Sequence, residues 1–132
     1  MIDIEVTVFD EICTYLATGY PNMRVENEIV AVPVSLPCAC IEEISNSVDT
    51  STIDSGSNEN YTNVDYEVRV YTNNTFGKRR EGRDIMSTID QWFINKGFIR
   101  TFTSFVSFDD GTKYQTISRY QAKTDGSTIY RR

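Results

Sequence analysis

The order of apolar and polar residues along the chain predicts two helices and several strands. The clearest strand runs from Tyr61 to Thr72, where apolar and polar residues alternate, so one face carries Val64, Tyr66, Val68 and Val70. Asp65, Glu67, Arg69 and Tyr71 then share the other face. The clearest helix runs from Lys78 to Lys96, with an apolar stripe of Ile85, Met86, Ile89, Trp92 and Phe93. Gly97 follows it in a position where helices favour glycine.

The first segment of the chain fits a helix better than a strand. Residues 2–8 alternate between apolar and polar types, as a strand does. The spacing of the apolar residues beyond them is helical: Phe9, Ile12, Cys13 and Leu16. Gly19, followed by Tyr20-Pro21, is a helix stop. We therefore expect a helix over residues 3–18.

Three further segments, residues 38–44, 98–108 and 114–123, have strand patterns. Asp109-Asp110-Gly111-Thr112 is a hairpin turn, so the strands on either side of it pair antiparallel. Residues 128–132 form a short terminal strand or arm. Two prolines within residues 22–37 indicate an irregular or edge segment.

Residues 45–60 hold only two large apolar side chains and predict a long polar loop. Such a loop either orders against a partner or has no special role. We therefore expect one α+β domain over residues 1–132. Its largely antiparallel sheet has about four strands and is flanked by two helices, with the polar loop at 45–60 and a C-terminal arm at 124–132.

Composition narrows the possible chemistry. The chain has 132 residues, no histidine and three cysteines. The absence of histidine excludes catalytic triads and histidine-based zinc sites. We expect Cys13, Cys38 and Cys40 to be reduced, as in the cytosol. No apolar run approaches the roughly 18 residues that a membrane span needs, and the N-terminal residues lack a signal-peptide pattern.

The acidic residues do not form an evident catalytic or metal site. Glu42 and Glu43 are neighbours on a strand, so their side chains point to opposite faces. Asp65 and Glu67 share a face, but they offer too few oxygen ligands for a metal, and a polar sheet face explains them better. No phosphate-binding, dinucleotide or hydrolase motif is present. We expect no enzyme activity, no cofactor and no metal.

The net charge of −6 hides a strong asymmetry. Residues 1–67 have a net charge of −12, whereas residues 68–132 have a net charge of +6. This split predicts one acidic and one basic surface, unless strand pairing neutralises it within the monomer. Four cations open the second helix, where its dipole disfavours them: Lys78, Arg79, Arg80 and Arg83.

These cations have three interpretations: contacts with DNA phosphates, contacts with an acidic patch of a neighbouring subunit, or a solvated face. The acidic pI of about 4.6 argues against general nucleic-acid binding. We expect the aromatic residues to be mostly core rather than a platform for bases: Tyr61, Tyr66, Tyr71, Trp92, Phe98, Phe102, Tyr114 and Tyr120.

Beyond these patterns, the chain resembles the tail-completion family of tailed phages. The resemblance lies in YEVRVYTNN from Tyr66, in GKRREGRDIMSTIDQWFINKGFIR from Gly77, and in YQTISRYQAKTDGSTIYRR from Tyr114. Upstream, Ile44-Ser45-Asn46-Ser47 and a first helix ending in Tyr20-Pro21 also fit. The family comprises tail terminators and head–tail joining proteins, often labelled minor capsid proteins.

The resemblance implies a four-stranded, largely antiparallel sheet with helices packed on it. It also implies a ring, commonly a hexamer, that caps the tail tube, joins it to the head connector and lets DNA pass through its centre. The chain would then be a structural protein of the virion neck, assembled in the host cytoplasm, with itself, the tail tube protein and the connector as partners. The alternatives are a stopper or adaptor protein of the same neck, or a protein that binds or processes nucleic acid.

For ring contacts we expect Lys78, Arg79, Arg80 and Arg83 to meet acids of the first half, Glu42, Glu43 and Asp65 among them. A terminal arm that includes Arg131 and Arg132 would extend onto a neighbour. A head-to-tail ring brings unlike surfaces together, so one acidic and one basic surface per subunit suits it.

Charge reversal of Arg79 and Arg80 is therefore expected to shift the protein toward monomer, because it places like charges across the contact. Size-exclusion chromatography or native mass spectrometry measures the shift, and assembly that is unaffected by the reversal would contradict the assignment.

Overall fold

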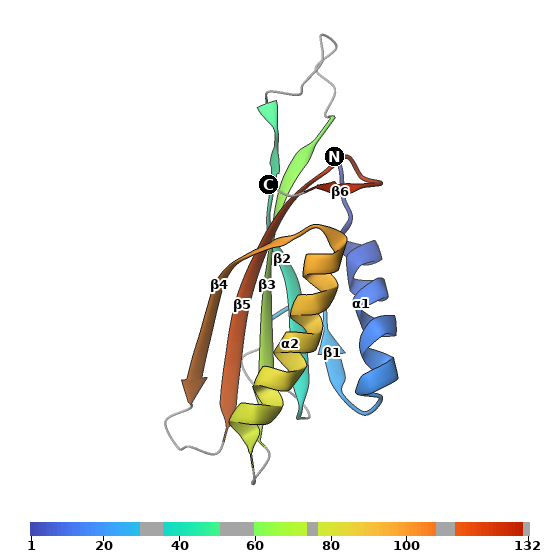
Figure 1. Ribbon diagram of the computed structural model, residues 1–132. Coiled ribbons are helices and arrows are strands. Elements are labelled where there is room, and N and C mark those ends of the chain that lie inside the picture. The colour runs from blue at the N-terminus through green and yellow to red at the C-terminus, as the bar shows by residue number, and fades with distance from the viewer. Residues whose placement is uncertain (30–35, 51–59, 74–76, 108–112, 131–132) are drawn as a thin grey trace.

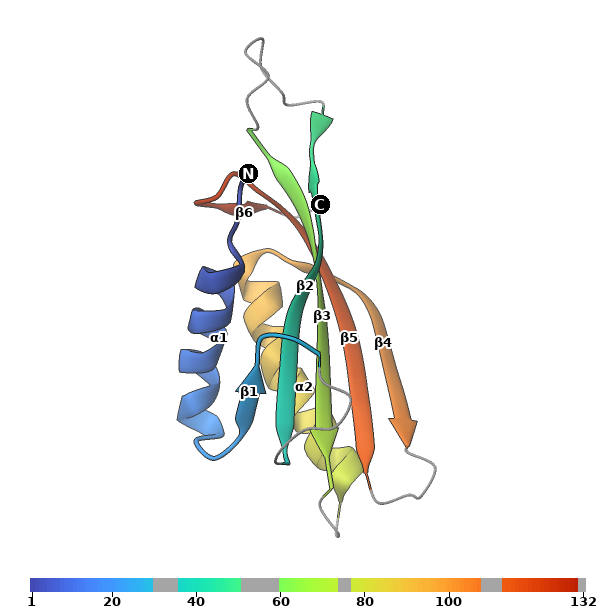
Figure 2. The ribbon, with the colours of Figure 1, turned by 180° about the vertical axis from the view of Figure 1, so that it is seen from behind.

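The computed structural model describes residues 1–29, 36–50, 60–73, 77–107 and 113–130. Two helices lie side by side on one face of a sheet, here called the helix face, and the opposite face is called the open face (Figures 1 and 2). The elements in chain order are α1 (Glu5–Gly19), β1 (Arg24–Glu26), β2 (Cys38–Val48), β3 (Thr62–Thr72), α2 (Lys78–Lys96), β4 (Ile99–Ser107), β5 (Tyr114–Thr124) and β6 (Ile129–Tyr130).

The main sheet has the strand order β1-β2-β3-β5-β4, and the short β6 pairs with β5. All of these pairs are antiparallel except β1 with β2, which is parallel. The α+β prediction is therefore confirmed, with a five-stranded main sheet where about four strands were expected. The added strand is β1, which lies in the segment that its prolines predicted to be irregular or an edge strand, and β1 is indeed an edge strand of the sheet.

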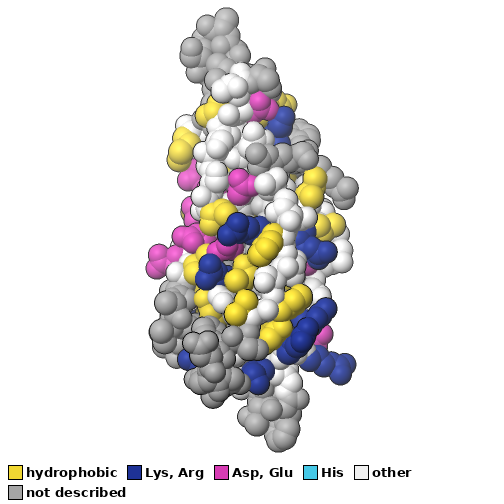
Figure 3. All heavy atoms as spheres, turned by 90° about the vertical axis from the view of Figure 1, so that its left-hand side faces the viewer, with side chains coloured by type: hydrophobic (Ala, Val, Ile, Leu, Met, Phe, Trp, Pro, Cys, Tyr) yellow, Lys and Arg dark blue, Asp and Glu magenta, His cyan; other side chains and the backbone are white. Residues whose placement is uncertain are grey.

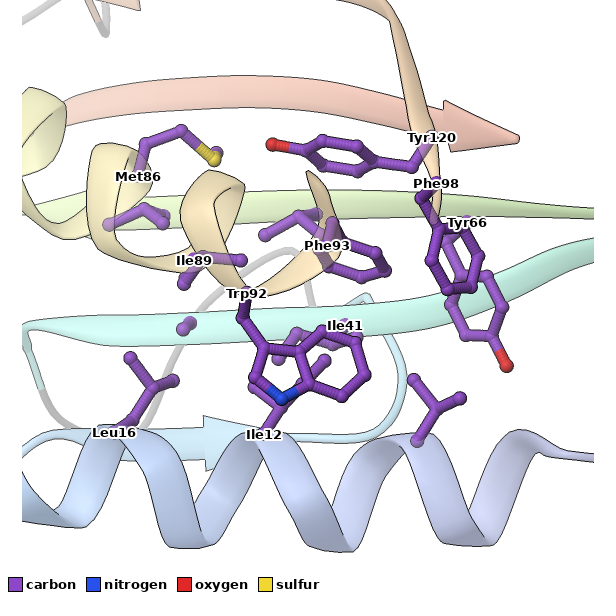
Figure 4. Close-up of a cluster of buried hydrophobic side chains, with 14 of the residues drawn as sticks. Ile12, Leu16, Ile41, Tyr66, Met86, Ile89, Trp92, Phe93, Phe98 and Tyr120 are labelled. Atoms are coloured by element: carbon purple, nitrogen blue, oxygen red, sulfur yellow. The ribbon is translucent and has the colours of Figure 1, made fainter. Parts of the chain in front are cut away.

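The core lies between the helices and β2, β3 and β5. It contains the predicted apolar face of β3 and the predicted stripe of α2, together with Val8, Ile12 and Leu16 of α1. Four aromatic rings connect α2 to the sheet (Figure 4). Phe93 stacks on Tyr120, with ring centroids 4.2 Å apart, and meets Phe98 edge-on at 4.9 Å. Tyr66 meets Phe98 edge-on at 5.6 Å.

Gly82 explains how closely α2 approaches the sheet. Glycine weakens a helix interior by about 1 kcal/mol relative to alanine. Here, however, a Cβ on Gly82 would lie 3.0 Å from Thr116 Oγ1 and 3.4 Å from Thr72 Oγ1. Because Gly82 has no Cβ, α2 can lie directly against β3 and β5. The lower helix propensity of glycine is the cost of this close packing.

Two β-bulges correct the expected alternation of side chains. In β4 the register shifts between Arg100 and Phe102, so Arg100 lies opposite Tyr120 on the helix face, and Phe102 lies opposite Arg119 on the open face. The sequence pattern had placed both on one face. In β2 the register shifts between Glu43 and Ser45, which leaves Ile44 exposed. An extra residue in one strand reverses every later side chain, and periodicity alone does not reveal it.

One predicted boundary is corrected, and one of two predicted alternatives is confirmed. Strand β2 continues to Val48 and pairs with β3, so residues 45–48 belong to the sheet rather than to the polar loop, of which 51–59 lie outside the described residues. Of the short terminal strand or arm expected at the end of the chain, the strand forms: β6 pairs with β5, and Asp125 in the turn before it accepts hydrogen bonds from the N–H groups of Ser127 and Thr128. The predicted turn at 109–112 also lies outside the described residues.

No helix in the described part of the chain is long and apolar enough to cross a membrane.

Gly97 ends α2 in a left-handed conformation, with φ +105°, and a Cβ there would lie 2.9 Å from the carbonyl oxygen of Ile129 in β6. We expect Gly97→Ala to lower the free energy of unfolding by about 1–3 kcal/mol, through backbone strain and this clash. Urea denaturation measures the loss. Gly19→Ala is the matched control: nothing lies within 4 Å of its added Cβ, so it is expected to be neutral or slightly stabilising.

Candidate functional site

The predicted basic cluster lies at the start of α2, above the edge strand β4. Arg79, Arg80 and Arg83 are exposed, and Lys78 is partly buried. Arg79 and Arg83 lie one helical turn apart and both face β4. The guanidinium carbon of Arg83 lies 4.5 Å from the ring centroid of Phe105, and that of Arg79 lies 5.9 Å from it. These are cation–π contacts, so the arginines are positioned by an aromatic residue of β4.

Strand β4 ends the sheet, and none of the described strands pairs with its outer edge. Three of its large apolar side chains are exposed: Phe102 at 46%, Phe105 at 37% and Val106 at 44%. Arg119 of β5 covers Phe102 on the open face, with its guanidinium carbon 5.5 Å from the ring centroid. Figure 3 shows the resulting surface, with apolar side chains between Lys and Arg side chains. We call it the β4 edge: Phe102, Phe105 and Val106 with Arg79, Arg83 and Arg119.

A groove of about 310 Å³ lies between α2 and β4 on the helix face. Phe105 and Met86 give it apolar walls, and Arg83 and Arg100 give it positive charge. Its carboxylate, Asp90, already accepts hydrogen bonds from Arg100 at 3.2 Å and from the Tyr120 hydroxyl at 2.9 Å. The groove therefore suits an inserted side chain that is apolar or acidic.

The structure separates the three acids expected to form one interface. Glu42 and Asp65 lie on the open face, opposite Glu67 and Gln121 in the strand register. Glu43 lies on the helix face, opposite Tyr66, near the start of α1. The prediction that Glu42 and Glu43 point to opposite faces is confirmed. Arg131 and Arg132 lie outside the described residues.

Glu67 is the charged centre of the open face. It is only 4% exposed, and it accepts hydrogen bonds from Arg69 at 3.0 Å and from Arg119 at 2.9 Å. Glu42 lies directly across the strand pair, and like charges in that position are destabilising. The two arginines offset this repulsion. The part of the open face around Asp65 and Glu67 is thus a paired polar surface, as expected. Farther along the same face Cys38, Cys40 and Tyr71 are buried in a small cluster with Ile29 and Leu36.

Ion pairs within the monomer neutralise part of the charge asymmetry. Besides the arginines on Glu67, Lys96 pairs with Glu11 at 3.2 Å, and Lys123 pairs with Asp49 at 2.6 Å. Each pair joins the acidic first half of the chain to the basic second half. Among the described residues no ion pair forms to Arg79, Arg80 or Arg83, so these charges remain available at the surface.

The cysteines are not organised for chemistry. All three are free thiols, as predicted, and Cys38 and Cys40 are fully buried. Burial is the main cause that raises the pKa of Cys38 to about 12, with the neighbouring Cys40 adding to it. A thiol held protonated in this way is a poor nucleophile.

Sequence reasoning missed the aromatic component of the β4 edge. Phe102 was expected in the core, and it is instead exposed. A bulge and an unpaired strand edge decide this, and neither leaves a signal in the alternation of residue types. Phe98 and the buried tyrosines 66, 71, 114 and 120 lie in the core as expected.

No protein-family model matches the chain, and no curated protein matches it either.

Glu67→Gln is expected to lower the free energy of unfolding by about 1–2 kcal/mol, because it leaves two arginines without their shared carboxylate, and both are partly exposed. Thermal and urea denaturation measure this. In Glu11→Gln, which breaks an exposed pair with Lys96, the loss is expected to stay below about 0.5 kcal/mol. Equal losses in both variants would show that the ion pairs of Glu67 stabilise the fold no more than an exposed pair does.

Proposed function

We propose that this chain is a structural protein of a tailed-phage virion. In this proposal it assembles head to tail into a ring that terminates the tail tube and joins it to the head connector. The observation that supports it most is the opposite character of the two sides of the sheet. A ring built from one repeated contact needs two unlike, complementary surfaces on each subunit.

The first surface is the β4 edge. It combines an unpaired strand, three exposed apolar side chains and three arginines. An exposed apolar edge strand is a liability in a free monomer, because it offers unpaired backbone groups to any other strand. Burial of this edge against a neighbouring subunit would remove the liability.

The second surface lies at the other side of the sheet, on α1, β1 and β2 (Figures 1 and 2). We call it the acidic edge: Asp10 and Glu11 of α1, Glu26 of β1 and Glu42 of β2. Glu11 pairs with Lys96 of α2 and Glu26 pairs with Arg24 of β1, whereas Asp10 and Glu42 form no ion pair among the described residues. Helix α1 contains no lysine or arginine. Two of its apolar side chains, Val6 and Tyr15, are exposed beside these acids.

The two edges match in chemistry. Arginines of the β4 edge would meet carboxylates of the acidic edge, and Phe102, Phe105 and Val106 would bury apolar surface against Val6 and Tyr15. Charge complementarity of this kind steers encounter and fixes orientation, while the apolar contacts supply most of the affinity. The geometry favours Asp10 and Glu42 as the acidic partners over Glu26, which pairs with Arg24, and over Glu43, which lies on the helix face.

The resemblance of the sequence to tail-completion proteins supports the place of this ring in the virion neck, with assembly in the host cytoplasm. DNA would pass through the lumen without specific binding. A stopper or adaptor of the same neck also forms rings, so the partner separates the two: a terminator binds polymerised tube protein, and a stopper binds the portal or adaptor.

Nucleic-acid binding is the competing class. Arg79, Arg83 and Arg119 lie over aromatic rings, which favours a protein contact. A DNA titration at several salt concentrations tests this class. Absent binding agrees with the ring, whereas tight binding that weakens steeply with salt would contradict it.

Val106→Lys is expected to shift the ring toward monomer, because it places a cation within an edge that is already basic. Val48→Lys is the matched control. The exposed fraction of Val48, 41%, is similar to that of Val106, but Val48 is the last residue of β2 and does not belong to the β4 edge. Native mass spectrometry measures both variants, and the control is expected to assemble as the unmodified protein does.

Negative-stain images of the protein with purified tail tubes then test the function itself. Rings that cap tube ends, seen with the unmodified chain and with Val48→Lys but not with Val106→Lys, are the expected outcome. Monomers that ignore the tubes would overturn the proposal.

A further inference from the structure

A second groove, of about 440 Å³, lies between α1 and α2 on the exposed side of the two helices. Tyr15 of α1 and Trp92 of α2 give it aromatic walls. The remaining lining residues are Asp10, Glu11 and Thr14 of α1 and Lys96 of α2. The groove is large enough for one aromatic side chain, and concave sites with apolar walls and a few polar groups are typical binding sites.

Trp92 forms the floor of this groove, and its position is fixed by the core. The residue is only 6% exposed, and its ring meets Phe93 edge-on with the centroids 5.2 Å apart. Figure 4 shows the indole pointing from α2 toward α1. Lys96 Nζ lies 5.7 Å from the Trp92 ring centroid and pairs with Glu11 at 3.2 Å. The groove is therefore formed within the monomer, before a partner binds.

The charge of the groove comes from Asp10. Lys96 and Glu11 neutralise each other. Asp10 is exposed, and it forms no ion pair among the described residues. An uncompensated carboxylate thus lies beside an aromatic floor, which suits an occupant that carries an aromatic ring and a cation side by side.

The β4 edge of this protein presents such a pair. Phe105 is 37% exposed, and the guanidinium carbon of Arg83 lies 4.5 Å from its ring centroid. Arg83 forms no ion pair among the residues that the structure describes. The cation–π contact holds ring and cation together as one unit.

One chain cannot place its own Phe105 in its own groove. Helix α2 lies between β4 and α1 in both views of the ribbon (Figures 1 and 2). The occupant that matches the groove in chemistry is therefore the β4 edge of a second copy. A contact between two different surfaces of identical chains can repeat from subunit to subunit, as a ring requires.

We propose that Phe105 of one subunit inserts into the groove between α1 and α2 of the next, with Arg83 pairing with Asp10 at its border. This inference rests on the proposed function, because it specifies the contact on which the head-to-tail ring depends. A buried aromatic side chain beside a charge-assisted pair is the kind of contact that carries most of the affinity of an interface.

A charge exchange tests the pairing of Arg83 with Asp10. Arg83→Glu and Asp10→Arg are each expected to raise the concentration at which half of the chains are assembled at least about tenfold, because each places like charges together. The double variant is expected to return to within about threefold of the unmodified chain, since the pair is restored with reversed signs. Native mass spectrometry over a dilution series measures all three.

Arg83→Glu combined with Glu42→Arg is the matched control. It introduces the same two charges, but Glu42 does not line the groove. We expect this control to assemble no better than Arg83→Glu alone.

Photo-cross-linking then tests the insertion of Phe105. The residue is replaced by p-benzoylphenylalanine, and isotopically labelled and unlabelled chains are mixed so that cross-links between copies can be recognised by mass. We expect cross-links from position 105 to Thr14, Tyr15 or Trp92 of another copy. The same photo-reactive residue at Val48, outside the β4 edge, is expected to give none at these residues.

Three results would overturn this contact: no restoration of assembly by Asp10→Arg, equal restoration by Glu42→Arg, or cross-links from position 105 that map to β1 or β2. Each of them is compatible with a ring that caps tail tubes, so the contact can fail while the proposed function stands. A chain that never assembles, alone or on tail tubes, would overturn both.

Discussion

The packing of α2 on the central strands determines where the surfaces of this protein lie. The stack of Phe93 on Tyr120, with Phe98 and Tyr66 edge-on beside it, fixes α2 over β3 and β5. Gly82 removes the one Cβ that would hold the helix away from Thr116 and Thr72. Because α2 is centred on these strands and α1 covers the β2 side, β4 extends beyond the helical layer. The exposure of Phe102, Phe105 and Val106 follows from that placement.

The charges are distributed by the same geometry. Acids of the first half of the chain that lie on the central strands meet their partners from the second half within the monomer, as Glu67 meets Arg69 and Arg119. On the side of the sheet away from the arginines of α2, Glu11 pairs with Lys96 and Glu26 pairs with Arg24, and the charge of Asp10 remains at the surface. Ion pairing within the monomer and oppositely charged surfaces therefore occur together in this molecule. The middle of the sheet is neutralised, and its two sides keep opposite signs.

The fold was largely predictable because its strands and helices have regular patterns. The strict alternation in β3 and the stripe of α2 each determine a buried face, and both faces lie in the core. The basic cluster at Arg79 and Arg83 was also visible in the sequence. The aromatic partners of these arginines were not, because a bulge reversed Phe102 and an edge position exposed Phe105. The groove that joins Asp10 and Tyr15 to Trp92 arises only from the packing of two helices far apart in the sequence, which no local pattern encodes.

The return of the chain at β6 has a consequence for how the molecule is oriented. The turn before β6 brings Gly126 next to Ile2, where a Cβ on the glycine would lie 3.6 Å from the isoleucine side chain. The first residues and β6 therefore lie at one end of the molecule, and the start of α2 lies at the other (Figures 1 and 2). In any ring whose subunits are related by one rotation axis, every N-terminus would lie at the same height along that axis. A fluorophore or gold label attached at Met1 would mark that level alone, and where the level lies away from the middle of the ring it would make the polarity of the assembly visible.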